Sequence, residues 1–431
     1  MATDCPEKIA ATYLARLGEW RVPTLLGVVH APTLRRDGSI LENPGFDHAS
    51  RLLYDPGAAK FAPIPEQPTR DEARAALDVL LQLIEPFKSV GPEDRAAVLA
   101  GVITPGVRRS MPHAPLFAIT APVAGSLKSK LVDTASYIWS GHPAPVTSQG
   151  GKDGGELEKR LSASLLAGGA LISIDNCERP LGGELLCQML SQLVCRVRIF
   201  GTLTNTDTPS NCCIYATGNN LLLMGDVTRR SLLASLDPRC ERPEEREFTG
   251  PPPDVEGANH REAYAVAALT ILRAYVVAGR PKQQAAALGG FEEWSRIVRD
   301  PLLWLGEADA CATMRKARDN DPVRAVILPL MEQWAEVIGV GEHDAMTAGA
   351  VVERANERDA PSFGSDEWRH PDFRAALLGV AVGNSGNLDQ NKLGYWLRAH
   401  KDRIVGGRRF VSAGQNRNKV ALWRLEQRDR S

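Results

Sequence analysis

The sequence predicts an α/β protein that has a core of strands and helices, helical segments before and after this core, and a separate C-terminal module. Three observations support this fold class. The apolar run Leu116–Thr120 enters a loop of small residues, which Lys128, Ser129 and a helical pattern follow. A second apolar run, residues 170–176, ends in Asp-Asn. Near the end of the chain, two helical patterns precede two apolar strands.

The composition is that of a globular protein. The chain has 431 residues, of which 43% are hydrophobic and 24% are charged. No run approaches the ~18 apolar residues of a membrane span, and the N-terminus has no apolar signal-peptide core. We therefore expect a cytoplasmic protein with no membrane segment. The eight cysteines form no C-x-x-C pair, which favours buried thiols over a metal site or disulfides.

The charge is unevenly distributed along the chain. The whole chain carries a net charge of −1, but from Asn387 onward eleven Lys and Arg face four acids. That segment therefore carries +7 and the remainder −8. A basic C-terminal segment on an acidic body indicates an anionic partner that is bound through the C-terminus.

Two segments precede the core. Residues 1–62 predict a short helix and strand-like pieces, and we treat them as an N-terminal docking segment. After a Pro-rich linker, Thr69 and Glu72 form a capping box for the helix that follows. A further helix over Pro92–Leu99 completes a helical lead-in. We assign residues 63–250 to this lead-in and the core.

The segment from Pro122 to Ser129 has the layout of a phosphate-binding loop. It offers backbone N–H groups, a lysine for the β- and γ-phosphates of ATP, a hydroxyl for Mg²⁺ and a helix N-terminus. In the glycine positions of the motif stand Pro122 and Leu127, and a Cβ at Leu127 strains a backbone that needs φ > 0. A Lys-Ser pair after a strand is also typical of an ordinary surface. The candidate ATP-binding residues are Gly125, Ser126, Leu127, Lys128 and Ser129.

Two later strands end in polar residues that suit such a site. Asp175 is placed to hold Mg²⁺ through water, or else caps a turn. Asn176 stands where many NTPases carry a Glu, and an amide orients water without accepting its proton. The segments RVRIFGTL and CCIYATGNN predict a hairpin whose second strand is central and ends beside Asn219. Arg229 and Arg230 follow, either as surface residues or as an arginine that reaches a neighbouring subunit.

These motifs together resemble a known family. APVAGSLKS, LISIDN, ELEKRL, YATGNN, GDVTRR and ERPEEREF are similar to the helicase core of phage- and plasmid-type replication proteins. Those are superfamily-three-like AAA+ ATPases, related to the primase–helicases of prophages and integrative elements. The resemblance implies that Lys128 and Ser129 bind ATP and Mg²⁺, that Asp175 is the Walker B acid, and that Asn219 senses the γ-phosphate. It also implies that Arg229 or Arg230 acts across a subunit interface in a homo-oligomeric ring, most simply a hexamer.

The sequence departs from the family in two places. Leu127 replaces the last glycine of the loop, and the expected hairpin tip, Thr204–Asn211, carries no Lys or Arg, although that hairpin commonly grips DNA in ring helicases. No primase motif is visible, and a partner chain is a candidate source of a primase. We treat 251–340 as a helical lid, whose Trp294, Trp304 and Trp334 are expected in the core.

Residues 341–431 predict a winged helix, because helix, turn and helix precede a β-hairpin. The basic charge favours DNA as its ligand over a protein. The candidate DNA-binding residues are Gln390, Asn391 and Lys392 on the second helix and Arg408, Arg409, Arg417 and Lys419 on the wing.

Two functions remain open. The first is a ring-forming, ATP-dependent DNA helicase or translocase of mobile-element replication, with a P-loop AAA+ core, a helical lid and a winged helix. The second is a non-catalytic DNA-binding initiator or regulator on a degenerate AAA+ scaffold, which Leu127, Asn176 and the uncharged hairpin tip favour. A metabolic kinase is less compatible, because no substrate pocket accompanies the loop.

Overall fold

The computed structural model describes residues 5–16, 21–151, 154–199, 201, 204–246, 250–359 and 367–428. The chain divides into two compact units. The first comprises Met1–Leu221 and Arg229–Arg315, and the second comprises Leu222–Thr228 and Lys316–Ser431.

A parallel sheet forms the centre of the first unit. In the described residues, five strands lie in the order β12-β6-β11-β8-β7, and every neighbouring pair is parallel. The strands are β6 (Leu116–Ala121), β7 (Val146–Ser148), β8 (Leu171–Asp175), β11 (Cys213–Asn219) and β12 (Ser231–Ser235). Strands β6, β8, β11 and β12 are buried over most of their length, as both faces of a parallel sheet must be. The predicted α/β class is confirmed.

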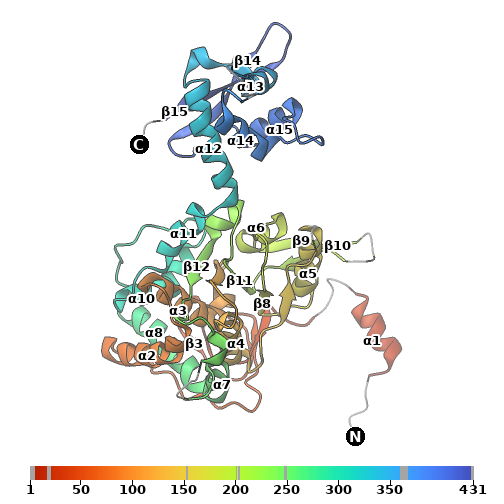
Figure 1. The fold of residues 1–431 in the computed structure, drawn as a ribbon. Helices are drawn as coiled ribbons and strands as arrows, with labels where there is room; N and C mark the ends of the chain where they lie inside the picture. Colours follow the sequence, from red (N-terminus) through yellow and green to blue (C-terminus); the bar gives the residue numbers. More distant parts are fainter. Residues whose placement is uncertain are drawn as a thin grey trace. The chain divides into compact units, whose positions relative to one another are not determined.

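Helices cover this sheet. In the view of Figure 1, α2, α3, α8 and α10 lie on one side of β8, β11 and β12, and α5 and α6 lie on the other. The helices of the first part of the chain are α1 (Glu7–Leu14), α2 (Arg70–Ile84), α3 (Pro92–Val107), α4 (Lys128–Ser140), α5 (Gly154–Leu166), α6 (Glu184–Ser191), α7 (Pro253–Asn259), α8 (Arg261–Val277), α9 (Glu292–Trp294), α10 (Asp300–Trp304) and α11 (Thr313–Asp319). One buried cluster joins α2, α3, α4 and α8 to the sheet.

The capping box before α2 is confirmed. Thr69 N donates to Glu72 Oε2 at 2.7 Å, and Glu72 N donates to Thr69 Oγ1 at 3.2 Å. Helix α3 is longer than predicted and continues through Pro105 to Val107. Proline cannot donate to the carbonyl four residues earlier, and Tyr215 Oη instead donates to Gly101 O at 2.5 Å. A tertiary contact thus satisfies the carbonyl that the proline leaves open.

Short strands precede α2. They are β1 (Gly27–Val29), β2 (Thr33–Leu34), β3 (Ile40–Leu41), β4 (Gly45–Asp47) and β5 (Leu52–Tyr54). Strands β2 and β3 pair as an antiparallel hairpin, and Gly38 turns it with φ of 94°. Ala31 and Leu34 belong to the same buried cluster as the sheet.

The hairpin before β11 differs from the prediction. Strand β9 (Val194–Arg198) pairs antiparallel with β10 (Asn205–Pro209), which the sequence analysis assigned to the turn. Cys195, Val197 and Thr208 point inward from these strands, and β-branched threonine favours such a strand. The predicted partner, β11, is instead a central parallel strand between β6 and β8, buried along its length. The predicted pairing was therefore wrong.

The second unit contains the predicted helices and hairpin. Its elements are α12 (Pro322–Val337), β13 (Met346–Thr347), α13 (Ala348–Ala355), α14 (Pro371–Ala381), α15 (Gln390–His400), β14 (Arg408–Gln415) and β15 (Ala421–Gln427). The strands form a sheet in the order β13-β15-β14. Helix α12, which the sequence analysis placed in the lid, contributes Leu330 and Trp334 to the same buried cluster as Phe373 and Phe410. The boundaries after residues 62 and 250 stay predictions.

Two composition-based predictions can be compared with the structure. Cys177, Cys195, Cys212 and Cys213 are buried free thiols, whereas Cys5 and Cys240 are exposed. Trp294 and Trp334 are fully buried, as predicted, whereas Trp304 is only partly buried against the core. Among the described helices, none combines the length and apolar character that crossing a bilayer requires.

Candidate nucleotide site and nucleic-acid interface

The loop after β6 lies at the carboxyl edge of the sheet. Helix α4 begins at Lys128, so its first N–H groups, which lack intrahelical partners, face this edge. Leu127 has φ of 63° and ψ of 13°, the left-handed conformation that favours glycine. This conformation costs a non-glycine residue roughly 1–2 kcal/mol. The Leu127 side chain packs against the buried cluster, and this contact offsets part of the strain.

Four side chains from three strand ends meet at this edge. Lys128 Nζ donates to Asn219 Oδ1 at 2.8 Å and to Val123 O at 3.1 Å. Ser129 Oγ donates to Asp175 Oδ1 at 2.8 Å. The strand order explains the meeting, since β11 lies between β6 and β8. The structure therefore brings together the lysine, hydroxyl, carboxylate and amide that the sequence singled out.

Burial changes the electrostatics of the lysine. Desolvation lowers the pKa of Lys128, and the nearby Asp175 carboxylate opposes this shift. A cation that is partly removed from water interacts more strongly with a phosphate than a fully solvated one. Thr217 Oγ1, near the end of β11, also donates to Asp175 Oδ1. Thr217 holds the carboxylate in place from the neighbouring strand.

Asn176 lies beside Asp175 in a left-handed conformation, with φ of 53°. Its backbone N donates to Thr217 Oγ1 at 3.3 Å, and its side-chain Nδ2 donates to Glu178 Oε1 at 3.1 Å. The amide itself cannot accept a proton. The carboxylate that Asn176 orients is that of Glu178.

Arg229 and Arg230 lie at the opposite edge of the sheet. They directly precede β12, whose Ser231 pairs with Leu116 at the start of β6, whereas the loop follows the end of β6. At about 3.3 Å per residue, a strand of this length separates the two edges by roughly 15 Å. The structure therefore does not bring these arginines to the Lys128 site of the same chain.

An acidic residue that the sequence analysis did not single out lies against the loop. A Cβ added at Gly125, whose φ is 73°, would come 3.0 Å from Glu244 N and 3.1 Å from Glu244 Oε2. Glu244 belongs to the short turn Pro243–Glu245, in which Pro243 is buried. Directly after this turn, Arg246 Nη2 donates to Pro86 O at 2.6 Å. The turn therefore holds the carboxylate of Glu244 beside the loop that follows β6. Only tertiary structure reveals this contact.

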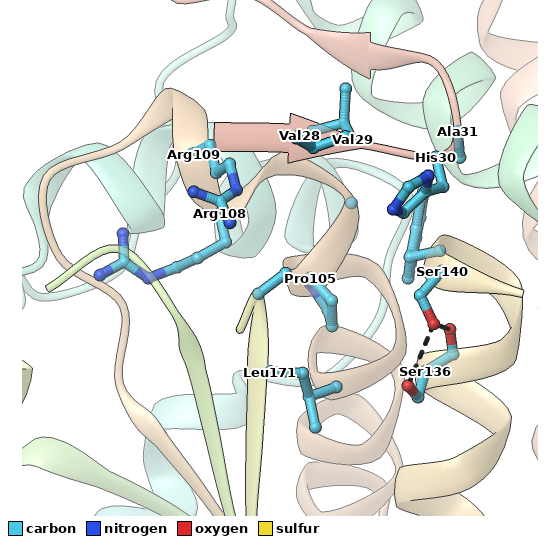
Figure 2. A pocket seen from close by; sticks show the side chains of 13 residues that line it. Val28, Val29, His30, Ala31, Pro105, Arg108, Arg109, Ser136, Ser140 and Leu171 are labelled. Carbon is cyan, nitrogen blue, oxygen red and sulfur yellow. Dashed lines mark hydrogen bonds between the residues drawn. The ribbon is translucent and has the colours of Figure 1, made fainter. Parts of the chain in front are cut away.

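A separate small pocket of about 50 Å³ lies at the other end of β8. Figure 2 shows its lining, which includes Val28, His30, Arg108, Arg109 and Leu171. Arg108 donates to three backbone carbonyls, and Arg109 Nη1 donates to Leu26 O at 2.9 Å. These guanidinium groups hold loops together. The lining of this pocket includes no lysine and no carboxylate, and the pocket is too small for a nucleotide.

The described hairpin is more basic than the sequence analysis expected. Arg196 and Arg198 lie on the exposed face of β9, two residues apart. Arg196 Nε donates to Asp207 Oδ1 on β10 at 2.8 Å. The predicted absence of basic residues applied to Thr204–Asn211, most of which forms β10 rather than the hairpin tip.

Helix α15 presents the three predicted residues and further exposed side chains beside them. Asn391 is exposed, as expected, but Lys392 Nζ donates to Val382 O at 2.8 Å. Gln390, although exposed, has its Oε1 close to Gly349 of α13. Tyr395, one turn after Asn391, is 69% exposed, and the Arg398 guanidinium lies 5.0 Å from its ring centroid. Tyr395 was missed, although its spacing of four residues from Asn391 signals a shared face.

The basic residues of the C-terminal hairpin fall into two classes. Arg409 Nη2 forms an ion pair with Glu426 Oε2 at 2.9 Å, and Arg408 Nε donates to Gln427 Oε1 at 3.2 Å. Hydrogen bonds from Arg424 and Arg409 hold the pKa of Glu426 below its usual value. By contrast, Arg417 and Lys419 lie exposed in the turn between β14 and β15. Within the described part of the chain, neither residue forms an ion pair.

Comparisons with known proteins were made for the whole chain. No protein-family model matches it, and no curated protein sequence matches it. A solved structure of the NrS-1 C-terminal region aligns at 12% identity and a TM-score of 0.39, over 76% of this chain and 68% of that one. A second structure of that region aligns at 11% identity and a TM-score of 0.35, over 72% of this chain and 64% of that one.

A third solved structure is described as the active helicase SCCmec type IV Cch. It aligns at 13% identity and a TM-score of 0.33, over 97% of this chain and 82% of that one. Because the TM-scores lie below 0.5, the functional proposals rest on the residues of this chain.

Proposed function

We propose that this protein is an ATP-dependent DNA helicase or translocase that acts in the replication of a mobile genetic element. The observation that carries the proposal is the hydrogen-bonded cluster of Lys128, Asn219, Ser129 and Asp175 at the carboxyl edge of the sheet. A cation, a hydroxyl, a carboxylate and a strand-end amide at a helix N-terminus suit a nucleoside triphosphate with Mg²⁺. The resemblance of the sequence motifs to replication helicases supports DNA as the substrate.

In this proposal, a bound nucleotide replaces the hydrogen bonds that the side chains of the cluster make with one another. Lys128 exchanges Asn219 Oδ1 for oxygens of the β- and γ-phosphates, and the freed Asn219 amide orients the attacking water. Ser129 and Asp175 would hold Mg²⁺, which when bound would supply positive charge beside the phosphates. Thr217 fixes Asp175 during this exchange. Glu178, held by Asn176, is the carboxylate proposed to take the proton of the water.

Arg229 and Arg230 are proposed to complete the site of a neighbouring subunit. Their place at the amino edge of β12 keeps them from the phosphate loop of their own chain. An arginine supplied in trans stabilises the charge of the transferred phosphoryl group. This arrangement requires a homo-oligomeric ring, most simply a hexamer.

The C-terminal unit is proposed to bind DNA as a winged helix. Asn391, Tyr395 and Arg398 on α15 face the major groove, and Arg417 and Lys419 contact phosphates. In the first unit, Arg196 and Arg198 on the β9–β10 hairpin offer a second contact for the DNA backbone.

A non-catalytic DNA-binding regulator is the second candidate. Three observations favour it: the strained Leu127, the amide of Asn176 in place of a carboxylate, and the Glu244 carboxylate beside the loop. In this alternative the cluster keeps its internal hydrogen bonds and serves as a scaffold. The two candidates differ in whether ATP is bound and hydrolysed.

A matched pair of lysine variants tests the proposal. Lys128 contacts Asn219, whereas Lys130 on the same helix forms an ion pair with Asp254 at 2.9 Å. We expect Lys128→Ala to abolish ATP binding and hydrolysis and Lys130→Ala to retain both. Binding is measured by titration calorimetry with Mg·ATP, and turnover by phosphate release. Equal turnover in wild type and Lys128→Ala would overturn the assignment of the loop.

A further inference from the structure

The chain passes from the first unit to the second and back again at the two ends of one short segment. Leu222–Thr228 belongs to the second unit, although Leu221 before it and Arg229 after it belong to the first. The segment begins three residues after Asn219, which contacts Lys128, and it ends directly before Arg229. Any displacement of this segment therefore acts through the backbone on both the proposed sensor of the γ-phosphate and the proposed trans-acting arginine.

Asp321 fastens this segment within the second unit. Its Oδ1 accepts from Gly225 N at 3.3 Å and from Val323 N, the first turn of α12, at 3.0 Å. Its Oδ2 accepts from Arg403 Nη2 at 3.3 Å. Arg403 lies between α15 and β14, the elements proposed to bind DNA. One carboxylate thus joins the segment, α12 and the proposed DNA-binding elements.

The burial and the hydrogen bonds of Asp321 make its contact with Gly225 specific. The Asp321 side chain is only 4% exposed, and a buried carboxylate is costly unless its oxygens are hydrogen-bonded. Gly225 has φ of 64°, and Thr228 Oγ1 donates to Gly225 O at 2.8 Å, which folds the segment into a compact turn. Loss of the Gly225 or Arg403 contact would leave part of the carboxylate unsatisfied. Gly225, Val323 and Arg403, the three partners of Asp321, are therefore expected to move together.

We infer that Asp321 is a positioning residue that couples DNA binding by the C-terminal unit to the nucleotide site. The inference rests on the proposed function and adds its regulation. DNA on α15 and the C-terminal hairpin changes the position of Arg403, Asp321 transmits this change to Gly225, and Leu222–Thr228 transmits it to Asn219 and Arg229. DNA thereby sets the rate of ATP hydrolysis without contacting the phosphate loop.

Graded variants of the full-length chain test the coupling. Asp321→Asn removes the charge but keeps an acceptor for Gly225 N, and Arg403→Gln removes only the cation. Arg403→Lys restores the charge. The control is Arg369→Gln, because Arg369 forms an ion pair with Glu357 at 3.4 Å in the same unit and does not contact the segment. Thermal unfolding establishes that each variant is folded.

The primary readout is ATP turnover with and without a mixed-sequence DNA duplex that carries a single-stranded dT tail. In Asp321→Asn and Arg403→Gln we expect the stimulation by this DNA to fall about fivefold or more, the lower end of usual coupling strengths. Basal turnover and DNA affinity stay at wild-type values, and Arg403→Lys recovers stimulation. Wild-type stimulation in folded Asp321→Asn would overturn the inference.

A second readout separates this inference from the proposed function. Hydrogen–deuterium exchange of residues 222–230 is measured with and without the same DNA, in the absence of nucleotide. We expect DNA to alter exchange in wild type and in Arg369→Gln but not in Asp321→Asn. If wild type hydrolyses no ATP, the proposed function fails, and the exchange result alone decides the coupling. Identical DNA-dependent exchange in wild type and Asp321→Asn would contradict it.

Discussion

The carboxyl edge of the parallel sheet and the tip of the C-terminal hairpin both carry basic residues, but the two regions hold them differently. Lys128 is partly buried and donates to Asn219 and Val123, whereas Arg417 and Lys419 lie exposed in a turn. A cation that is partly removed from water and held by hydrogen bonds binds an anionic group in one defined position. Exposed cations attract any polyanion, and salt screens them. The comparison therefore separates a preformed site from an electrostatic surface.

The largest effect is expected at the preformed site. Asp175→Ala removes the carboxylate that Ser129 and Thr217 contact and that is proposed to hold Mg²⁺. We expect turnover to fall by about 10²–10³-fold, the usual cost of losing a preorganised electrostatic group. Phosphate release at saturating Mg·ATP measures the effect. Asp254→Ala, which breaks only the pair with Lys130, is the control, and equal losses in both variants would deny Asp175 its role.

The exposed surface should respond to salt. Arg417→Ala with Lys419→Ala is expected to weaken DNA binding and to reduce the slope of log K against log salt by about 2, one unit for each phosphate contact. Arg408→Ala with Arg409→Ala should change the slope less, because Gln427 and Glu426 engage these arginines. Fluorescence anisotropy across a salt series measures both pairs. Equal slopes in the two double variants would show that the exposed and the hydrogen-bonded basic residues of the hairpin contribute equally to DNA binding.

The smallest effect is expected beside the loop. Glu244→Gln removes a negative charge next to Gly125 without changing the shape of the side chain. We expect Mg·ATP to bind about twofold to fivefold tighter, since exposed charges interact by less than ~1 kcal/mol. Titration calorimetry measures the change, with Glu245→Gln as the neighbouring control. Weaker binding in Glu244→Gln would show that this carboxylate assists the nucleotide rather than opposing it.

The sequence predicted local features better than tertiary ones. The Thr69–Glu72 capping box, the left-handed strain at Leu127 and the strand ends at Asp175 and Asn219 depend on neighbouring residues, and the structure contains each of them. Lys128 meets Asn219 because β6 and β11 are parallel and share a carboxyl edge, whereas the sequence analysis placed Asn219 on a hairpin strand.

The features that escaped prediction depend on distant contacts. Glu244 reaches Gly125 only because the chain turns back after β12. Polar β10 pairs with β9 because both have an inward-facing row of residues, a pattern that a turn-rich composition obscured. Lys392 is engaged by the carbonyl of Val382, which no spacing rule indicates. On α15, Tyr395 and Arg398 join the candidates for DNA contact, and the roles of Gln390, Asn391 and Lys392 stay predictions.

The most direct test of the proposed motor is ATP turnover with and without single-stranded DNA, measured in wild type and in Leu127→Gly. Glycine adopts the left-handed conformation of residue 127 without strain. We expect wild type to hydrolyse ATP faster when DNA is present, and Leu127→Gly to match or exceed it. Turnover in Leu127→Gly alone would identify a helicase disabled by its loop. The absence of turnover in both proteins would contradict the ATPase assignment and leave the DNA-binding regulator.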